Sequence, residues 1–128
     1  MRAGYEYAVV RVVPDPAREE FVNVGIIVLG ERAGVLRAAF DVDEARLFAI
    51  APAVDLALVR RHLEAIERVC AGAADAGPVA ALPIRERFGW LVSPRSTLIQ
   101  TSAPHGGVTA DLDAVLAHLL DRMVRRPR

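Results

Sequence analysis

Two long β-forming runs near the amino end place the strongest constraint on the fold of this chain. Residues 5–13 and 21–29 are dense in valine, isoleucine and aromatic side chains, and Pro14, Asp15 and Pro16 lie between them. β-branched and aromatic residues favour strands, whereas proline and aspartate favour turns. The sequence therefore predicts two strands joined by a short connection.

The second run is apolar on both sides if its residues alternate strictly. One face then holds Val22, Val24, Ile26 and Val28, and the other holds Phe21, Asn23, Gly25, Ile27 and Leu29. Under this pattern Asn23 and Gly25 form a notch on one face. Arg11 and Arg37 can extend to that face from the neighbouring strands. Gly25 can equally mark a bulge, or allow a helix to approach closely.

The rest of the chain adds two further strands and otherwise shows helical periodicity. These elements predict the α+β class, with a small antiparallel sheet of three to four strands and three to four helices in the order βββααα-βα. They are a strand over 35–41, a short helix capped by Asp41 or Asp43, a longer helix from Asp55 to Gly72, a helix over 83–91, a strand over 97–102 and a final helix capped by Thr109 or Asp111.

The composition fits a single globular domain over residues 1–128. Hydrophobic residues make up 53% of the chain and charged residues 25%, and 16 basic residues, all arginine, balance 16 acidic ones. A protein that binds a phosphate backbone is usually far more basic, so nucleic-acid binding is disfavoured. Its remaining support is the basic tail over 122–128, together with Tyr5, Tyr7 and Trp90 as stacking rings.

The sequence also favours a cytoplasmic protein without membrane contact. No apolar signal core follows Met1 and Arg2, and the apolar run from Val24 to Leu29 is far shorter than the roughly 20 residues that a membrane helix needs. The single cysteine cannot form an internal disulfide, which suits a reducing compartment.

We find no pattern that predicts catalysis, a metal site or a cofactor. Cys70 continues the apolar stripe of its helix, which indicates a packed thiol. The three histidines, His62, His105 and His118, lack the spacing of metal ligands. We therefore expect no catalytic residue, no metal ligand and no cofactor, and an enzyme is the less favoured interpretation.

The segment over 93–107 is rich in hydrogen-bond donors. Arg95 can hold an anion through two hydrogen bonds, Ser96 and Gln100 can add further contacts, and His105 precedes two glycines with accessible backbone N–H groups. With the two polar residues of the first strands, the candidate ligand-binding set is Arg11, Asn23, Arg95, Ser96, Gln100 and His105. The alternative is that these segments are turns around an edge strand.

Two segments resemble the signatures of a bacterial family of unknown function, the domain family numbered 3037. The first reads Tyr-Glu-Tyr-Ala-Val-Val-Arg-Val-Val-Pro-Asp-Pro from Tyr5 to Pro16 and continues Arg-Glu-Glu-Phe-Val-Asn-Val-Gly to Gly25. The second reads Arg-Phe-x-Trp-Leu-x-x-Pro-Arg-Ser-Thr from Arg87, followed by Gln-x-Ser-x-x-His-x-Gly from Gln100. The resemblance spans nearly the whole chain and implies no activity or catalytic residue. Members are similar to proteins encoded beside HipA-type kinases, which implies a partner role in a toxin or stress-response pair.

Two functional hypotheses follow. The first is a small cytoplasmic protein-interaction or regulatory module without catalysis, with a protein partner for which the resemblance suggests a HipA-type kinase. The alternative is an enzyme or sensor that binds a phosphorylated or nucleotide-like small molecule through Arg95 and His105, with Arg11 as a second anion clamp. The sequence does not decide between a monomer and a homo-oligomer. The broad apolar stripe of the last helix can pack inside one domain or against a second copy of the chain.

Overall fold

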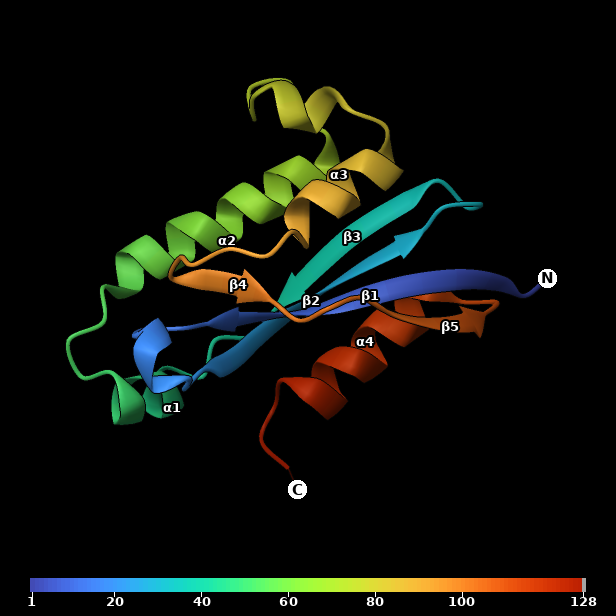
Figure 1. Ribbon diagram of the computed structural model, residues 1–128. Helices are drawn as coiled ribbons and strands as arrows, with labels where there is room; N and C mark the ends of the chain where they lie inside the picture. Colours follow the sequence, from blue (N-terminus) through green and yellow to red (C-terminus); the bar gives the residue numbers. More distant parts are fainter. Residues whose placement is uncertain (128) are drawn as a thin grey trace.

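A computed structural model describes residues 1–127, and its centre is a five-stranded antiparallel sheet with helices on both faces (Figure 1). The strand order is β3-β2-β1, and β4 and β5 both pair with the remaining side of β1. The strands are β1 (Ala3–Val12), β2 (Val22–Gly30), β3 (Val35–Phe40), β4 (Ile99–Thr101) and β5 (His105–Thr109). The helices are α1 (Glu44–Ile50), α2 (Leu56–Ala71), α3 (Ile84–Leu91) and α4 (Leu112–Met123), with short 3-10 turns η1 (Pro16–Arg18) and η2 (Pro78–Ala81).

The predicted α+β class is confirmed, although the sheet has one strand more than the sequence indicated. The additional strand is β5, where two glycines predicted only a turn before the last helix. Gly106 and Gly107 pair with Glu6 and Tyr5 of β1. A Cβ atom at Gly107 would overlap the ring of Tyr5, so glycine here makes room for a cross-strand neighbour.

Three predicted aspartate caps begin helices. Asp43, Asp55 and Asp111 begin α1, α2 and α4, and each carboxylate accepts a hydrogen bond of 3.1 Å from the N–H three residues further on. Such a cap contributes about 1 kcal/mol to helix stability. The alternative caps were Asp41, which lies one residue beyond β3, and Thr109, which belongs to β5.

A β-bulge in β2 overturns the strict alternation expected for that strand. Val10 pairs with Gly25, whereas the next residue, Arg11, pairs with Asn23. Val24 is therefore an extra residue in β2. Val22, Val24, Ile27 and Leu29 therefore face the α2 side of the sheet, and Ile26 and Val28 face the α4 side. The expected notch does not form, because Gly25 faces Phe40 on the α2 side and Asn23 bonds to Met123 of α4.

The two faces of the sheet carry two separate hydrophobic cores. Helices α2 and α3 cover one face, whose core also includes Leu47 of α1, and α4 covers the other face (Figure 1). Strand β1 contributes to both cores, because Val10 faces α2 and Val9 faces α4. Burial of one such aliphatic side chain stabilises the fold by about 1.5–3 kcal/mol. Both faces of the sheet are thus held by packed helices. The edge formed by β4 and β5 consists only of short strands.

We predict that Gly25→Ala lowers the free energy of unfolding by about 1–3 kcal/mol, a cost typical of overpacking. The new methyl group would overlap the ring of Phe40 and lie 2.7 Å from the carbonyl oxygen of Ala39. Gly89→Ala is the matched control in α3, because its Cβ would meet no atom within 4 Å. Replacing a helical glycine there should raise stability by about 0.5–1 kcal/mol. Urea denaturation followed by circular dichroism measures both variants, and a Gly25→Ala protein as stable as the wild type contradicts the bulge packing.

Candidate functional site

The outer side of β4 is an open edge of the sheet. β4 pairs with β1 alone, and next to it the Ser102 N–H donates to the Val9 carbonyl at 2.8 Å. Alternate residues of an antiparallel ladder turn their backbone groups toward the partner strand. Ser102 and Gln100 therefore face β1, and Ile99 and Thr101 turn their N–H and C=O groups away from it. No other strand of residues 1–127 faces these outward groups.

This edge strand lacks charged side chains, which block strand pairing at many sheet edges. Natural edge strands are commonly protected by charged side chains, proline or extreme shortness. Residues 96–110 contain no Asp, Glu or Arg, although 25% of the chain is charged. Pro104 interrupts the edge between β4 and β5, and Thr97 Oγ1 donates to the Ile99 carbonyl at 2.8 Å. The outward N–H of Ile99 and both outward groups of Thr101 can still bind a further strand.

A groove of about 280 Å³ lies beside β4 on the α2 side. Its wall is mostly apolar, and the indole of Trp90 is exposed there to 44%. None of the lining residues is acidic. They are His62, Ala65, Ile66 and Val69 of α2, Trp90 of α3, and Arg95, Thr97 and Ile99 of the segment that enters β4.

Arg95 supplies the positive charge of this groove. Its guanidinium carbon lies 4.2 Å from the centroid of the Trp90 ring, and its Nη2 donates to the Trp90 carbonyl at 2.5 Å. A cation over an indole is stabilised by about 0.5–1 kcal/mol at an exposed site. Within the described chain no carboxylate pairs with Arg95. Its Nε and Nη1 donors are therefore held at the groove wall and are available to an anion.

Three other predicted residues form a row across the α4 side of the sheet. Arg11 pairs with Asn23 of β2 and with Gln100 of β4. The Arg11 guanidinium lies 4.1 Å from the ring centroid of Phe21, and Asn23 Nδ2 donates to the Met123 carbonyl at 3.1 Å. Burial lowers the pKa of Arg11, and neither Arg11 Nε nor Asn23 Oδ1 has a hydrogen-bond partner among the described residues. The shared face expected for Arg11 and Asn23 is therefore present.

The structure does not bring Arg95 and His105 together. His105 opens β5 and stacks on Tyr7 with ring centroids 5.5 Å apart, and Tyr7 packs on the α4-side core. Arg95 lies on the opposite, α2 side of the sheet, so it is separated from Arg11 as well. Ser96 is exposed beside Arg95. The six predicted residues thus divide between two faces.

Sequence reasoning missed most of the groove. It did not single out Ile66 or Val69, which look like ordinary positions of an amphipathic helix, and it considered Trp90 only as a stacking ring. It also gave no weight to the outward backbone of Thr101. The signal that was available is the uncharged stretch over 96–110, which directly follows Arg95.

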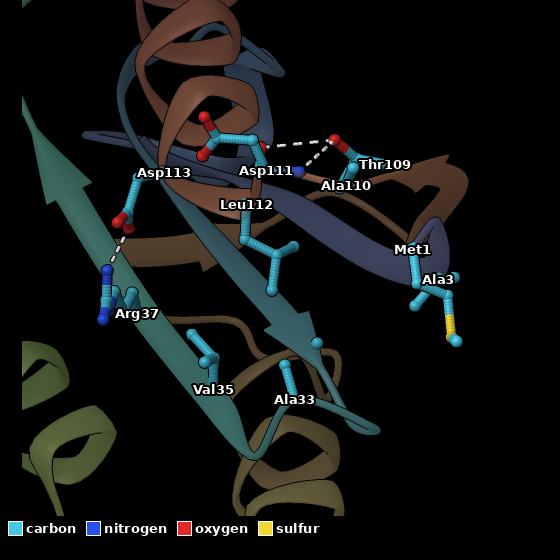
Figure 2. Close-up of a pocket in the computed structure, with 12 residues that line it drawn as sticks. Met1, Ala3, Ala33, Val35, Arg37, Thr109, Ala110, Asp111, Leu112 and Asp113 are labelled. Carbon is cyan, nitrogen blue, oxygen red and sulfur yellow. Dashed lines mark hydrogen bonds and ion pairs between the residues drawn. The ribbon is translucent and has the colours of Figure 1, made fainter.

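A second hollow, of about 270 Å³, lies between the start of α4, the β2–β3 turn and the beginning of β1 (Figure 2). Its polar groups already have partners. Arg37 pairs with Asp113, and the Asp111 N–H already donates to Thr109 Oγ1 at 3.0 Å. The carboxylates of the N-cap residue Asp111 and of Asp113 in the first turn of α4 also repel an anion. Leu112 fills the space above Gly30, and nothing in this hollow points to a ligand.

The one cysteine of the sequence, Cys70, is buried in α2. Burial raises the pKa of the Cys70 thiol to about 12, which keeps it protonated at neutral pH. Within residues 1–127 no three His, Cys, Asp or Glu side chains gather in a way that could hold a metal ion. No helix in the same residues combines the length and apolar character needed to cross a membrane.

Taken together, these features define a small α+β domain with an open antiparallel edge and an adjacent cationic groove. Comparison with protein families matches residues 7–124 to the family described as "Protein of unknown function (DUF3037)", and the chain belongs to that family. The match confirms the resemblance carried by the two signature segments. Comparison with curated proteins and with solved structures returned no match.

We predict that Cys70 of the folded protein is unreactive toward a disulfide reagent such as DTNB at pH 8. The thiolate is the reactive form, and the raised pKa of this buried thiol makes the thiolate scarce. Labelling should be complete only in denaturant, with the absorbance of released thionitrobenzoate as the readout. Rapid stoichiometric labelling without denaturant would show that Cys70 is accessible and ionised.

Proposed function

We propose that this chain is a protein-interaction module that binds an extended segment of a partner protein along the outer edge of β4. The observation that supports this most is the pair of outward-facing residues, Ile99 and Thr101, on a strand without charged side chains. In strand addition, main-chain hydrogen bonds supply affinity, and pockets beside the edge supply specificity. The groove at Trp90 provides such a pocket next to the same strand.

The proposal includes a cytoplasmic location and no catalysis by this chain. The single cysteine supports a reducing compartment, because it cannot form an internal disulfide. The resemblance to proteins encoded beside HipA-type kinases makes such a kinase the first partner to test. In that case the chain would act by occupying or positioning a segment of the kinase.

The small-molecule alternative has weaker support. It required Arg95 and His105 in one polar cluster, and the sheet separates these two side chains. An anionic ligand would need hydrogen bonds of about 3 Å to side chains on opposite faces of the sheet.

Nucleic-acid binding is also disfavoured by the charge arrangement. The net charge is +0, and in the basic tail Arg125 and Arg126 pair with Asp41 and Asp43. The last arginine of the tail, Arg128, lies outside the described residues. Each arginine that already neutralises a carboxylate contributes less to phosphate binding.

The experiment is affinity capture with the tagged protein from nuclease-treated extract of its own cells, using the wild type, Thr101→Pro and Thr101→Ala. Proline removes an outward N–H without removing a hydrogen bond to β1, and alanine keeps that N–H. We predict one stoichiometric partner that the wild type and Thr101→Ala retain and that Thr101→Pro loses at least tenfold. Circular dichroism and thermal unfolding check that the proline variant is folded.

Recovery of the wild type alone would contradict the interaction module. A partner retained equally by all three proteins would contradict docking at the β4 edge. Mixing the purified chain with a HipA-type kinase, followed by size-exclusion chromatography, tests that candidate directly.

A further inference from the structure

The groove beside β4 indicates what kind of segment the edge accepts. This inference rests on the proposed docking of a strand at β4. We infer that the partner segment is acidic and extended. One of its apolar side chains lies in the groove, and the carboxylate of an Asp or Glu two residues away binds Arg95.

The spacing follows from the geometry of a sheet. A strand added to β4 continues the pleat, so its side chains opposite Ile99 lie on the same face as Ile99. Ile99 packs into the α2-side core and lines the groove. Every second side chain of the added strand therefore faces the groove, and two such side chains are about 7 Å apart.

The apolar position follows from the groove wall. Ile66 and Val69 of α2 line the groove together with the partly exposed Trp90 of α3. A space of about 280 Å³ accommodates one branched or aromatic side chain. Covering apolar surface stabilises a complex by about 25 cal/mol for each Å² removed from water.

The acidic position follows from charge complementarity. Arg95 has no carboxylate partner within the described chain, and no lining residue of the groove is acidic. Stacking on Trp90 holds the guanidinium flat, so little side-chain freedom is lost when its free donors bind a carboxylate. A carboxylate can then accept a charge-assisted hydrogen bond from Nε or from Nη1, whereas a basic side chain would be repelled.

A second copy of this chain is a poorer occupant. Pairing of β4 with β4 of another copy would bring together two stretches over 96–110, which contain no Asp or Glu. Both copies of Arg95 would remain without a carboxylate from that stretch. The groove therefore favours a different, acidic chain.

The test is selection of a displayed library of random eight-residue peptides on the full-length protein, with parallel selections on Arg95→Gln, Thr101→Pro and Arg32→Gln. Arg32 is exposed in the β2–β3 turn and serves as the matched charge control. On the wild type and on Arg32→Gln we expect enrichment of Asp or Glu two residues from Leu, Ile or Phe. Arg95→Gln should keep the apolar preference and lose the acidic one, and Thr101→Pro should lose enrichment altogether.

Affinities of one enriched peptide and its Asp→Asn counterpart can be measured by fluorescence, because Trp90 is the single tryptophan and lines the groove. The wild type should prefer the acidic peptide at least tenfold, Arg95→Lys should retain part of that preference, and Arg95→Gln should show less than a twofold difference.

The possible failures are distinguishable. Strand-forming peptides enriched without any acid would overturn the acidic segment and leave docking at the edge intact. If the wild type enriches no more peptides than Thr101→Pro does, both the acidic segment and docking at the β4 edge are overturned. A dimer that light scattering detects in the wild type and not in Thr101→Pro would identify a second copy as the occupant and overturn the inference.

Discussion

The pairing of β1 on both of its sides is the constraint on which the rest of the structure depends. β1 hydrogen-bonds to β2 along one side and to β4 and β5 along the other, and its residues alternate between two cores. Val10 is completely buried toward α2, and Val9 is buried toward α4. β1 is hydrogen-bonded along both edges and packed on both faces. A shift in its register would therefore expose apolar side chains. The position of β4, and therefore of the open edge, is fixed by this strand.

The groove and the open edge lie together because one short segment contributes to both. After α3 ends, the chain places Arg95 over Trp90 and then enters β4 at Ile99. The same Ile99 contributes its side chain to the groove and its outward N–H to the edge. An unprotected edge is an aggregation risk, and here the three-residue length of β4 and the nearby Pro104 limit that risk. Edge and groove thus form a small, sharply bounded surface.

Periodicity and cap residues predicted most of the secondary structure, and the failures have identifiable physical causes. The aspartate at position 111 begins α4 because local backbone chemistry decides a cap. The faces of β2 were wrong beyond Val24, because a bulge adds one residue and the pattern of an all-apolar strand does not reveal it. β5 was missed because Gly107 has low strand propensity, and its pairing depends on the distant Tyr5.

The candidate site was predicted only in part for a similar reason. The placement of Arg11 beside Asn23 follows from two adjacent strands, which sequence can pair. The grouping of Arg95 with His105 required knowing on which side of the sheet the chain enters β4, and the turn-rich sequence around Arg95 does not contain that information. The groove itself depends on α2 and β4, which are far apart in the sequence.

The most direct measurement of the central claim is amide hydrogen exchange at three neighbouring residues of β4, in the free protein and in a purified complex with its partner. In the free protein, the Gln100 N–H should exchange slowly because it faces β1, and the N–H groups of Ile99 and Thr101 should exchange quickly. In the complex, both outward amides should slow by at least tenfold while Gln100 changes little. Slow exchange of Ile99 and Thr101 in the free protein, or unchanged fast exchange in the complex, would contradict an edge that accepts a strand.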